Sequence, residues 1–495
     1  MKKVVVIGAG ISGLAAAIYA QRSGFNVTIC EQHSIAGGMC TSWKRKGYLF
    51  EGAIHWLTGS SSQFKDLNQI WRETGALNDN VPIIYHQTFR SIEWEGQIIH
   101  LYRDIDKTAE QLLAISPKDE RQIKQLVKDV KILSKITVPV FDVKGVKTEN
   151  PHRMSLGFIL KMLQVLPVML KMMRLSSGEY IARFAHPGIR QLLRRTIDEY
   201  TAYASIGTFA IQYTGDGGYP EGGSLPMVSR MVKTFTELGG KLLLNTKVQK
   251  INIYDGAATG VKLKTGMLDA DAVIITQETI AAMEKLFDTP PQDEWLKKIR
   301  RDTEPELCTF IGIGIRIKLP GNNLPEWKLE TPITYAGQTV THLGFYNYCE
   351  YEGYAPDGCT VLTAILSKDT YDFWKQAKAD GRYEAEKQSL AEQVSHALCQ
   401  KYPQCEGKIE VIDIATPLTY ERYTGAYKGS WMATFRTSKN AGKRYPGFCK
   451  DVKGLYFAGH RLMPPGGLPF ALISGRVAAQ MVCRDNNVIF KGNIK

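Results

Sequence analysis

Residues 3–31 read KVVVIGAGISGLAAAIYAQRSGFNVTICE. The apolar, β-branched run at 3–7 predicts a buried parallel strand. A glycine-rich turn follows at once, and residues 14–22 then predict a helix that Gly24 ends. Residues 25–30 predict a second strand. A strand, a glycine turn, a helix and a second strand in this order predict a βαβ unit of the Rossmann type.

The three glycines of the turn have the spacing G-x-G-x-x-G of a dinucleotide-binding loop. The first permits the tight turn, the second lets the backbone approach a pyrophosphate, and the third lets the helix pack closely on the strand. The free N–H groups at the helix N-terminus would hold the phosphates, and an acid 18 residues after the third glycine would bind ribose hydroxyls. The predicted dinucleotide-binding residues of this segment are Gly8, Gly10, Ile11, Ser12, Gly13 and Glu31.

This motif serves both NAD and FAD, and two later segments favour FAD. The first holds Gly37, Gly38 and Met39, which predict a second loop close to a long cofactor, where an NAD domain normally continues into its next helix. In the second, a short strand over 454–459 ends in glycine, and a loop rich in glycine and proline leads to a final helix over 470–483. A distant segment that returns to the first domain suits FAD, whose flavin lies far from its adenine.

A second G-x-G-x-x-G motif is missing from the sequence, because Gly312-Ile313-Gly314 lacks the third glycine. NAD(P) or another electron carrier would therefore bind transiently and not in a domain of its own. The sequence also lacks a nucleophile–base motif and a metal-ligand cluster. We therefore predict no metal, and the chemistry falls to the flavin.

The composition is that of a soluble protein, with 44% apolar and 22% charged residues, and a length of 495 residues predicts two domains. The nine cysteines are scattered and none lie in a C-x-x-C pair, which indicates a reducing, cytoplasmic compartment. The net charge of +13 suits an acidic substrate or an anionic membrane surface. Because no nucleic-acid-binding motif accompanies this charge, nucleic acid is not a predicted partner.

Together these motifs resemble the phytoene desaturase, carotenoid cis-trans isomerase and retinol saturase group of FAD-dependent oxidoreductases. The resemblance covers residues 1–60, 219–276, 416–429 and 454–475. The N-terminal motif is shared with amine oxidases and many other flavoproteins, but the run TPLTYERYTG at 416–425 is more specific for the polyene-acting group.

The resemblance implies an α/β fold with a Rossmann-type, glutathione-reductase-like FAD-binding domain, in the amine-oxidase and phytoene-desaturase arrangement, and an inserted α+β substrate domain. We expect residues 1–64, 216–284 and 450–495 in the FAD-binding domain. Residues 65–215 and 285–449 form the expected substrate-binding domain, in which 91–94 and 97–100 predict an antiparallel hairpin. Further cofactor-binding residues implied by the resemblance are Val248, through its backbone, and Gly459, His460, Gly467, Leu468 and Pro469.

The resemblance also implies a long apolar substrate, such as an isoprenoid or fatty polyene. Its C=C bonds would undergo saturation, desaturation or isomerisation by hydride or electron transfer at flavin N5. His55, Trp56 and Phe470 are the predicted lining of the active site. Two alternatives stay open: a flavin amine oxidase-like enzyme, and a non-catalytic flavin-binding partner protein whose site Phe470 closes.

Three residues depart from the family pattern. His460 stands where an acid is usual, and the ordinary imidazole pKa near 6.5 predicts that its charge changes within the physiological pH range. Pro465 and Phe470 stand where the related loop usually has glycine. Phe470 would press on the flavin ring or narrow the substrate space, which leaves open a different lipophilic or aromatic substrate.

Residues 155–175 predict a helix with a wide face of methionine and leucine and a narrow stripe that holds Lys161 and Lys171. Pro167 would kink this helix. Such a helix suits an anionic membrane surface or the lid of a lipophilic tunnel, and a helix buried between the domains is the alternative. The longest uncharged apolar run, at 162–170, is too short to span a membrane. We therefore expect a cytoplasmic protein that binds a membrane peripherally.

Overall fold

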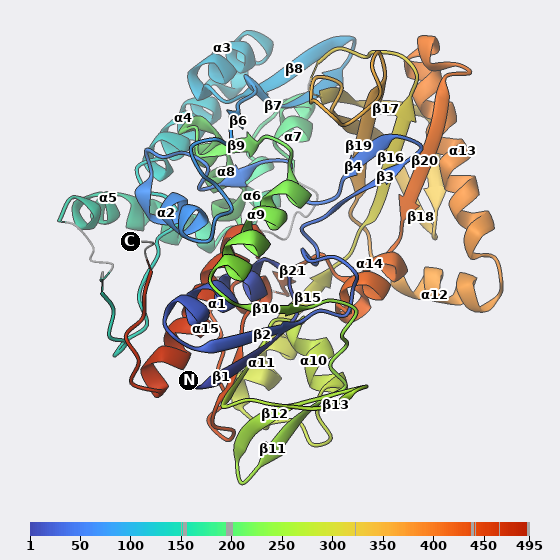
Figure 1. Cartoon of the computed structure of the whole chain (residues 1–495). Helices are drawn as coiled ribbons and strands as arrows, with labels where there is room; N and C mark the ends of the chain where they lie inside the picture. Colours follow the sequence, from blue (N-terminus) through green and yellow to red (C-terminus); the bar gives the residue numbers. More distant parts are fainter. Residues whose placement is uncertain are drawn as a thin grey trace.

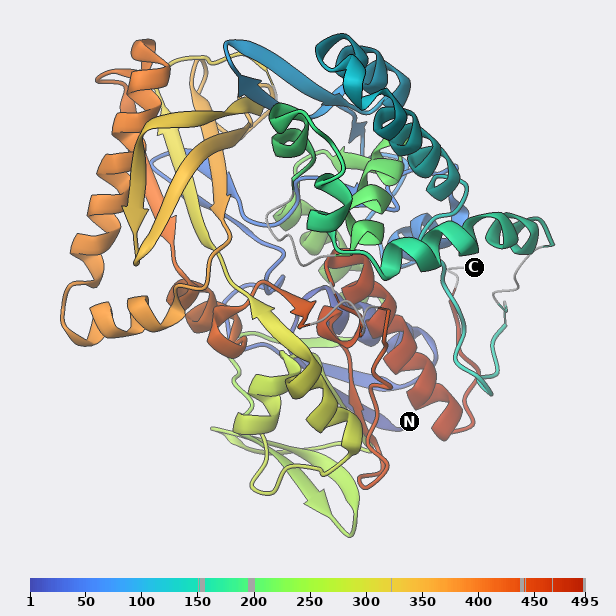
Figure 2. The ribbon, with the colours of Figure 1, turned by 180° about the vertical axis from the view of Figure 1, so that it is seen from behind.

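The structure is a computed structural model that describes residues 1–149, 151, 156–194, 201–321, 323–436, 440, 442–464 and 466–492. A parallel sheet forms the lower lobe in Figure 1, and a second, mixed sheet lies in the upper lobe. A cluster of helices lies beside the mixed sheet, and the C-terminal helix lies against the N-terminal βαβ unit (Figures 1 and 2).

The lower lobe is built on five parallel strands in the order β10-β2-β1-β14-β22. The central strands β1 and β14 are almost completely buried, as expected for a sheet that is covered on both faces. This sheet confirms the predicted Rossmann-type fold. The strands are β1 (Lys3–Ile7), β2 (Asn26–Cys30), β10 (Lys241–Leu243), β14 (Ala272–Ile275) and β22 (Leu455–Phe457).

Alternate residues of β1 enter two separate cores. Val4 and Val6 pack on the side of the three long helices, while Val5 and Ile7 pack on the side of a three-stranded meander. The long helices are α1 (Ile11–Arg22), α9 (Ser224–Glu237) and α15 (Leu468–Asp485). The opposite face is covered by β11 (Lys250–Tyr254), β12 (Ala257–Leu263), β13 (Gly266–Asp269), α10 (Thr279–Lys285) and α11 (Glu294–Asp302).

Glycines let α1 pack closely on its neighbours. A Cβ on Gly13 would lie 2.0 Å from the carbonyl oxygen of Gly8, and a Cβ on Gly475 would lie 2.3 Å from the carbonyl oxygen of Ser12. The first contact seats α1 on the glycine turn after β1, and the second seats α15 on α1. The C-terminal helix is thereby fixed beside the N-terminal turn.

The upper lobe is built on a seven-stranded sheet in the order β20-β16-β19-β18-β17-β7-β8, in which only the β17–β7 pair is parallel among the described strands. The predicted hairpin at 91–100 is confirmed as β7–β8. The strands are β7 (Thr88–Trp94), β8 (Gln97–Tyr102), β16 (Thr309–Ile315), β17 (Asn323–Tyr335), β18 (Gln338–Asn347), β19 (Thr360–Leu366) and β20 (Ile409–Ala415). The helices α12 (Tyr371–Ala379) and α13 (Tyr383–Lys401) cover one face.

The other face of this sheet receives a hairpin from the N-terminal segment, β3 (Ser42–Arg45) and β4 (Tyr48–Glu51). A Cβ on Gly312 would lie 2.7 Å from the ring of Phe50, and a Cβ on Gly314 would lie 2.5 Å from the ring of Tyr48. The two glycines in the middle of β16 therefore make room for aromatic rings of β4.

Helices between residues 105 and 213 form one side of the upper lobe, with their own apolar core. They are α3 (Ile105–Ile115), α4 (Glu120–Leu133), α5 (Leu156–Met173), α6 (Ser177–Ile181), α7 (Pro187–Leu193) and α8 (Ala202–Tyr213). Smaller elements connect the lobes: β5 (Leu57–Thr58), α2 (Lys65–Glu73), β6 (Ile83–Ile84), β9 (Gly217–Pro220), β15 (Thr303–Glu306), α14 (Pro417–Thr424) and β21 (Met432–Phe435). The division into two domains at the expected boundaries stays a prediction.

The helix α5 is mostly exposed, although it is the most apolar long helix of this cluster. Val165 and Met172 are its buried residues, so the interpretation of this segment as a helix buried between domains is wrong. By length and composition, α5 is the one helix of the described ranges that would also suffice to cross a membrane. Its exposed apolar side chains are Leu156, Ile159, Leu160, Leu163, Leu166 and Leu170.

We expect Gly475→Ala to lower the free energy of unfolding by about 1–3 kcal/mol, because the added Cβ would press on the backbone of α1. Gly207→Ala in α8 is the matched control, because apart from its chain neighbours and the backbone of α8 itself, no atom of the described chain lies within 4 Å of its added Cβ. Alanine should stabilise that position through its helix propensity by roughly 1 kcal/mol. Denaturant unfolding followed by circular dichroism measures both variants, and equal stabilities would contradict the packing argument.

Candidate active site

A cavity of about 1580 Å³ lies between the two lobes, larger than the roughly 300–1,000 Å³ of an ordinary small-molecule site. It brings together residues of the N-terminal turn, the second glycine loop, the segment after β4 and the C-terminal loop. Gly13 is absent from this lining and packs instead on the Gly8 carbonyl. The predicted site residues that line the cavity are Gly8, Gly10, Ile11, Ser12, Glu31, Gly37, Gly38, Met39, His55, Trp56, Val248, Gly459, His460, Gly467, Leu468, Pro469 and Phe470.

Two glycine loops form a backbone cradle at one end of the cavity. Gly8 has a φ of +103° and donates its N–H to the Cys30 carbonyl, which makes the tight turn after β1. Gly10 is the N-cap of α1 and forms an isolated parallel β-bridge with Gly37. A Cβ on Gly38 would lie 3.4 Å from the Gly10 Cα. Because the N-cap is glycine, no side chain covers the first N–H groups of α1, and the positive end of the helix faces the cavity. This geometry fits a pyrophosphate.

Glu31 lies at the end of β2 and is buried in the cavity wall. Its carboxylate accepts hydrogen bonds from Ala9 N–H (2.8 Å) and His33 N–H (2.8 Å). A carboxylate has about four lone-pair sites, so acceptor capacity remains for ribose hydroxyls. The backbone carbonyl of Glu31 accepts from Thr246 N–H at 2.7 Å, which brings the segment of Val248 beside it. Glu31 and Val248 thus lie close together in the wall of the cavity.

The C-terminal loop lines the same cavity as the cradle. The N–H of Gly459 donates to Ser474 Oγ (2.9 Å) on α15, which fixes the end of β22 against this helix. The N–H of Gly467, the N-cap of α15, donates to His460 Nδ1 at 3.5 Å. Pro465, one of the departures from the family pattern, lies outside the described residues.

Burial changes the electrostatics that the sequence predicted for His460. Desolvation, and secondarily the Arg461 cation, lower the pKa of His460 to about 4. The prediction that this imidazole changes charge within the physiological pH range is therefore wrong. His460 is neutral there.

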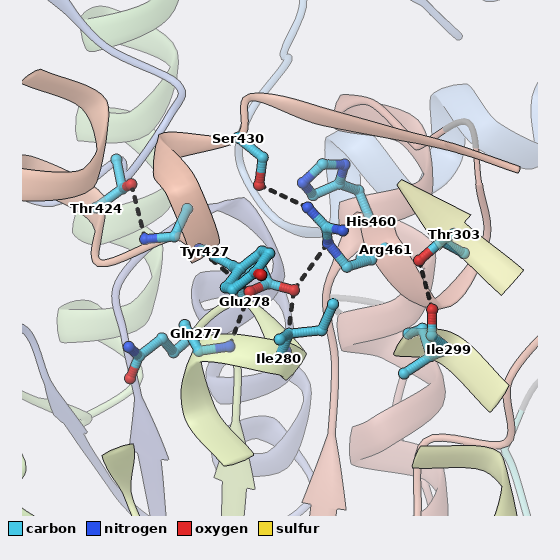
Figure 3. A network of polar contacts seen from close by, with 12 residues as sticks. Gln277, Glu278, Ile280, Ile299, Thr303, Thr424, Tyr427, Ser430, His460 and Arg461 are labelled. Atoms are coloured by element: carbon cyan, nitrogen blue, oxygen red, sulfur yellow. Dashed lines mark hydrogen bonds and ion pairs between the residues drawn. The ribbon is translucent and has the colours of Figure 1, made fainter. Parts of the chain in front are cut away.

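A buried ion pair lies beside His460 and was not found from the sequence (Figure 3). Arg461 Nε lies 2.8 Å from Glu278 Oε1, and Arg461 Nη2 donates to Ser430 Oγ at 2.5 Å. Glu278 also accepts from the N–H groups of Ile280 (3.0 Å) and Tyr427 (3.2 Å). The network joins the end of β14, the segment after α14 and the C-terminal loop. Positions so far apart in the sequence carry no spacing signal that reveals such a pair.

Arg461 also offers an unused donor to the cavity. Its Nη1 atom is buried and has no hydrogen-bond partner among the described residues, and the residue lines the cavity. An uncompensated buried donor costs free energy. The oxygen atoms of a large cofactor would satisfy it, so the donor fits the group that the glycine cradle indicates.

The segment after β4 presents His55 and Trp56 to the middle of the cavity. Glu51 at the end of β4 is buried and accepts from Ala53 N–H (3.0 Å), and Ser224 N–H at the start of α9 donates to it (3.0 Å). Burial raises the pKa of Glu51. These bonds fix the turn that carries His55 and Trp56.

The His55 ring stacks on Tyr346 with centroids 4.0 Å apart and an interplanar angle of 4°. Its Nδ1 atom lies 3.1 Å from the Tyr348 hydroxyl, and burial lowers the pKa of His55 to about 4. Trp56 packs edge-on against Phe89 at 5.3 Å. The tyrosines were missed from the sequence, although the run with tyrosine at 346, 348, 351 and 354 was a visible signal.

The cavity continues from this point into the helical side of the upper lobe, where its wall is apolar. Three methionines of α5 line it, and they are less exposed than the leucines of the same helix. Within the described ranges, no three His, Cys, Asp or Glu side chains gather as they would around a metal ion. The apolar lining includes Leu133, Pro139, Met162, Met169, Met173 and Phe209.

Comparisons with known proteins agree with this arrangement. The family model for flavin-containing amine oxidoreductases matches residues 11–483. The 1-hydroxycarotenoid 3,4-desaturase of Flavobacterium sp. (strain P99-3) is 23% identical over 98% of this chain and 100% of its own. The 4,4'-diapolycopene oxygenase of Methylomonas sp is 25% identical over 98% of each chain. These relatives confirm the resemblance to the phytoene desaturase group.

Solved structures share the fold over nearly the whole chain. An oxidoreductase from Methanosarcina mazei has a TM-score of 0.61 at 18% identity, over 96% of this chain and 99% of its own. Putrescine oxidase bound to putrescine has a TM-score of 0.61 at 16% identity, over 97% of this chain and 99% of its own. The chain therefore belongs to the family of flavin-containing amine oxidoreductases and is an FAD-dependent oxidoreductase of the phytoene desaturase-like group.

Proposed function

We propose that this enzyme saturates, forms or isomerises C=C bonds of a long, apolar polyene of the isoprenoid or fatty class. The observation that carries the proposal is the continuity of one cavity, which runs from the glycine cradle to an apolar chamber. A chamber lined by methionine, leucine and aromatic side chains suits a hydrocarbon chain and excludes water. The names of the carotenoid desaturase and oxygenase relatives support this substrate class.

In this proposal the chain's own residues hold the two ends of FAD separately. The first N–H groups of α1, at Ile11 and Ser12, bind the pyrophosphate above Gly10. Glu31 binds the ribose, and Val248 contacts the adenine through its backbone. When bound, FAD supplies a hydride acceptor and donor at N5.

The flavin end of the cofactor lies, in this proposal, against the C-terminal loop and the segment after β4. Gly459, His460, Gly467, Leu468 and Pro469 would hold it, and Met39 follows the Gly37–Gly38 loop of the cradle. The positive N-terminal end of α15 favours negative charge there. Trp56 and Phe470 restrict the substrate space beside it. NAD(P) or another carrier would exchange electrons transiently.

We expect Glu31→Ala to weaken FAD binding by about 1–3 kcal/mol, roughly 5- to 150-fold in Kd, because the ribose hydroxyls lose their acceptor. Fluorescence titration of the apoprotein with FAD measures the Kd. Thermal unfolding of the wild-type and Glu31→Ala apoproteins shows whether loss of the hydrogen bond from Ala9 N–H lowers the stability of the fold itself. Glu237→Ala, an exposed acid on α9, is the control. An unchanged Kd for Glu31→Ala would exclude Glu31 as the ribose ligand.

The substrate class is tested by anaerobic mixing of the FAD-loaded enzyme with vesicles that contain 4,4'-diaponeurosporene, a polyene of the kind that the relatives' names print. We expect the visible absorption of the bound flavin to bleach. Putrescine is the second probe, because it would bleach the flavin of an amine oxidase that has the same fold. Bleaching by putrescine alone would replace the polyene proposal with the amine oxidase alternative.

We further propose that α5 lies in the plane of an anionic membrane surface. Six large apolar side chains of this helix are exposed, and so are the basic residues Lys161, Lys171 and Arg174. A helix with an apolar face and basic residues binds lipid headgroups and acyl chains together. Met162, Met169 and Met173 of the same helix line the cavity, so the helix would separate the bilayer from the apolar chamber. A cytoplasmic enzyme bound peripherally to the membrane is the corresponding localisation.

We expect salt-sensitive binding to vesicles that contain phosphatidylserine, and loss of most of this binding when Lys161, Lys171 and Arg174 are changed to glutamine. The physical reason is the loss of about 1 kcal/mol of attraction for each basic residue near an anionic surface. Vesicle co-sedimentation at low and high salt measures it.

The matched control changes Lys297, Lys298 and Lys328 to glutamine. These lysines are exposed elsewhere on the molecule, and the control removes the same net charge. Equal loss of binding in both triple variants would mean that the general charge and not α5 attracts the membrane.

A further inference from the structure

A second, small cavity of about 40 Å³ adjoins the large one behind His55. His55, Trp56, Phe89 and Tyr346 line both cavities. A volume of this size holds roughly three waters at about 10–15 Å³ each. Its lining includes several polar side chains, namely His86, Gln212, Tyr219, Asn347, Tyr348 and Tyr351.

The small cavity has unused hydrogen-bonding capacity. The Nε2 atom of Gln212 is buried and has no partner among the described residues. Water needs two to four polar partners to be stable in such a place, and Gln212 with the tyrosine hydroxyls supplies them. The cavity is therefore suited to hold water beside an otherwise apolar chamber.

His55 forms the wall between the two cavities and has one free nitrogen. Its ring is held by the stack on Tyr346 and by the contact of Nδ1 with the Tyr348 hydroxyl. Its Nε2 atom is buried and finds no hydrogen-bond partner in the described part of the chain. A neutral imidazole presents one donor and one acceptor. With Nδ1 engaged, Nε2 is the atom left for a substrate or for water.

The small cavity leads towards the surface at its other end. His86 Nε2 is hydrogen-bonded to the Tyr351 hydroxyl, and both residues line the cavity. Both residues are only half-buried. Groups with exchangeable protons thus line the small cavity both at His55 and at the Tyr351–His86 pair.

We propose that His55 is a catalytic acid–base residue that exchanges its proton with solvent through the water-holding cavity and the Tyr351–His86 pair. This inference rests on the proposed function. When a C=C bond is formed, one carbon loses a hydride with its electron pair to the flavin. The neighbouring carbon loses a proton to His55 Nε2, and the electron pair of that C–H bond becomes the new π bond. When a C=C bond is saturated, the reduced flavin would give a hydride to one carbon, and the π electron pair would take the proton of His55 Nε2 to form the C–H bond at the other.

The surroundings favour such a route. A charge left beside the apolar side chains of the chamber is costly. Burial lowers the pKa of His55, so the imidazolium passes its proton on and does not retain it. The small cavity and His86 then carry the proton to solvent.

The proton route is tested without any substrate, by NMR of the FAD-loaded enzyme labelled with ¹⁵N-histidine. The His55 signal is identified by its loss in His55→Gln. We expect a His55 ring proton that exchanges quickly with water, and loss of this fast exchange in His86→Gln. His100→Gln is the control, because His100 contacts Ser91 on the β7–β8 hairpin and lines neither cavity. Unchanged exchange in His86→Gln would overturn the route.

The catalytic role is tested by the anaerobic bleaching of the flavin with 4,4'-diaponeurosporene vesicles. We expect His55→Gln to slow bleaching by about 10²–10⁴-fold, the usual contribution of a general acid–base residue, and added imidazole to restore part of the rate in His55→Gly. The Kd for FAD, measured alongside, excludes loss of cofactor as the cause. A rate in His55→Gln equal to that of wild type would overturn the role. If wild type itself is not bleached, the proposed function fails, and the NMR measurement still decides the proton route.

Discussion

The rest of the structure depends on one constraint, the close packing of α1. This helix packs against the glycine turn that follows β1 and against α15. Gly13 lets α1 rest on the Gly8 carbonyl, and Gly475 lets α15 rest on α1. At both positions an added methyl group would overlap the neighbouring backbone, so only glycine allows this packing. The two contacts place the loop that ends at Gly467 beside the N-terminal cradle, although the two segments lie at opposite ends of the chain.

Two buried carboxylates extend this arrangement to the rest of the cavity wall. Glu278 joins Arg461 to the segment after α14, and Glu51 joins β4 to the start of α9. Both acids are satisfied by N–H donors in place of water. Because the loss of one partner would leave a buried charge, these joints fix the walls that the two lobes contribute to a single cavity.

The same burial decides the charge state of the cavity. His55 and His460 are both neutral at physiological pH because desolvation lowers the pKa of each to about 4. Arg461 forms its ion pair with Glu278. The middle of the cavity therefore offers hydrogen-bonding groups without a titrating charge, which suits an apolar substrate beside a polar cofactor.

The sequence by itself determined the βαβ unit, its glycine turn, Glu31, the second glycine loop and the return of the C-terminal segment, because strand and helix periodicity and glycine spacing are local properties. It also indicated His55 and Trp56. Only the tertiary structure decided that His460 is neutral, that Arg461 meets Glu278, that the glycines of β16 receive Phe50, and that α5 is exposed. Desolvation, ion pairing and exposure depend on which distant segments are in contact in the folded chain. The spacing of residues within one segment does not predict those contacts.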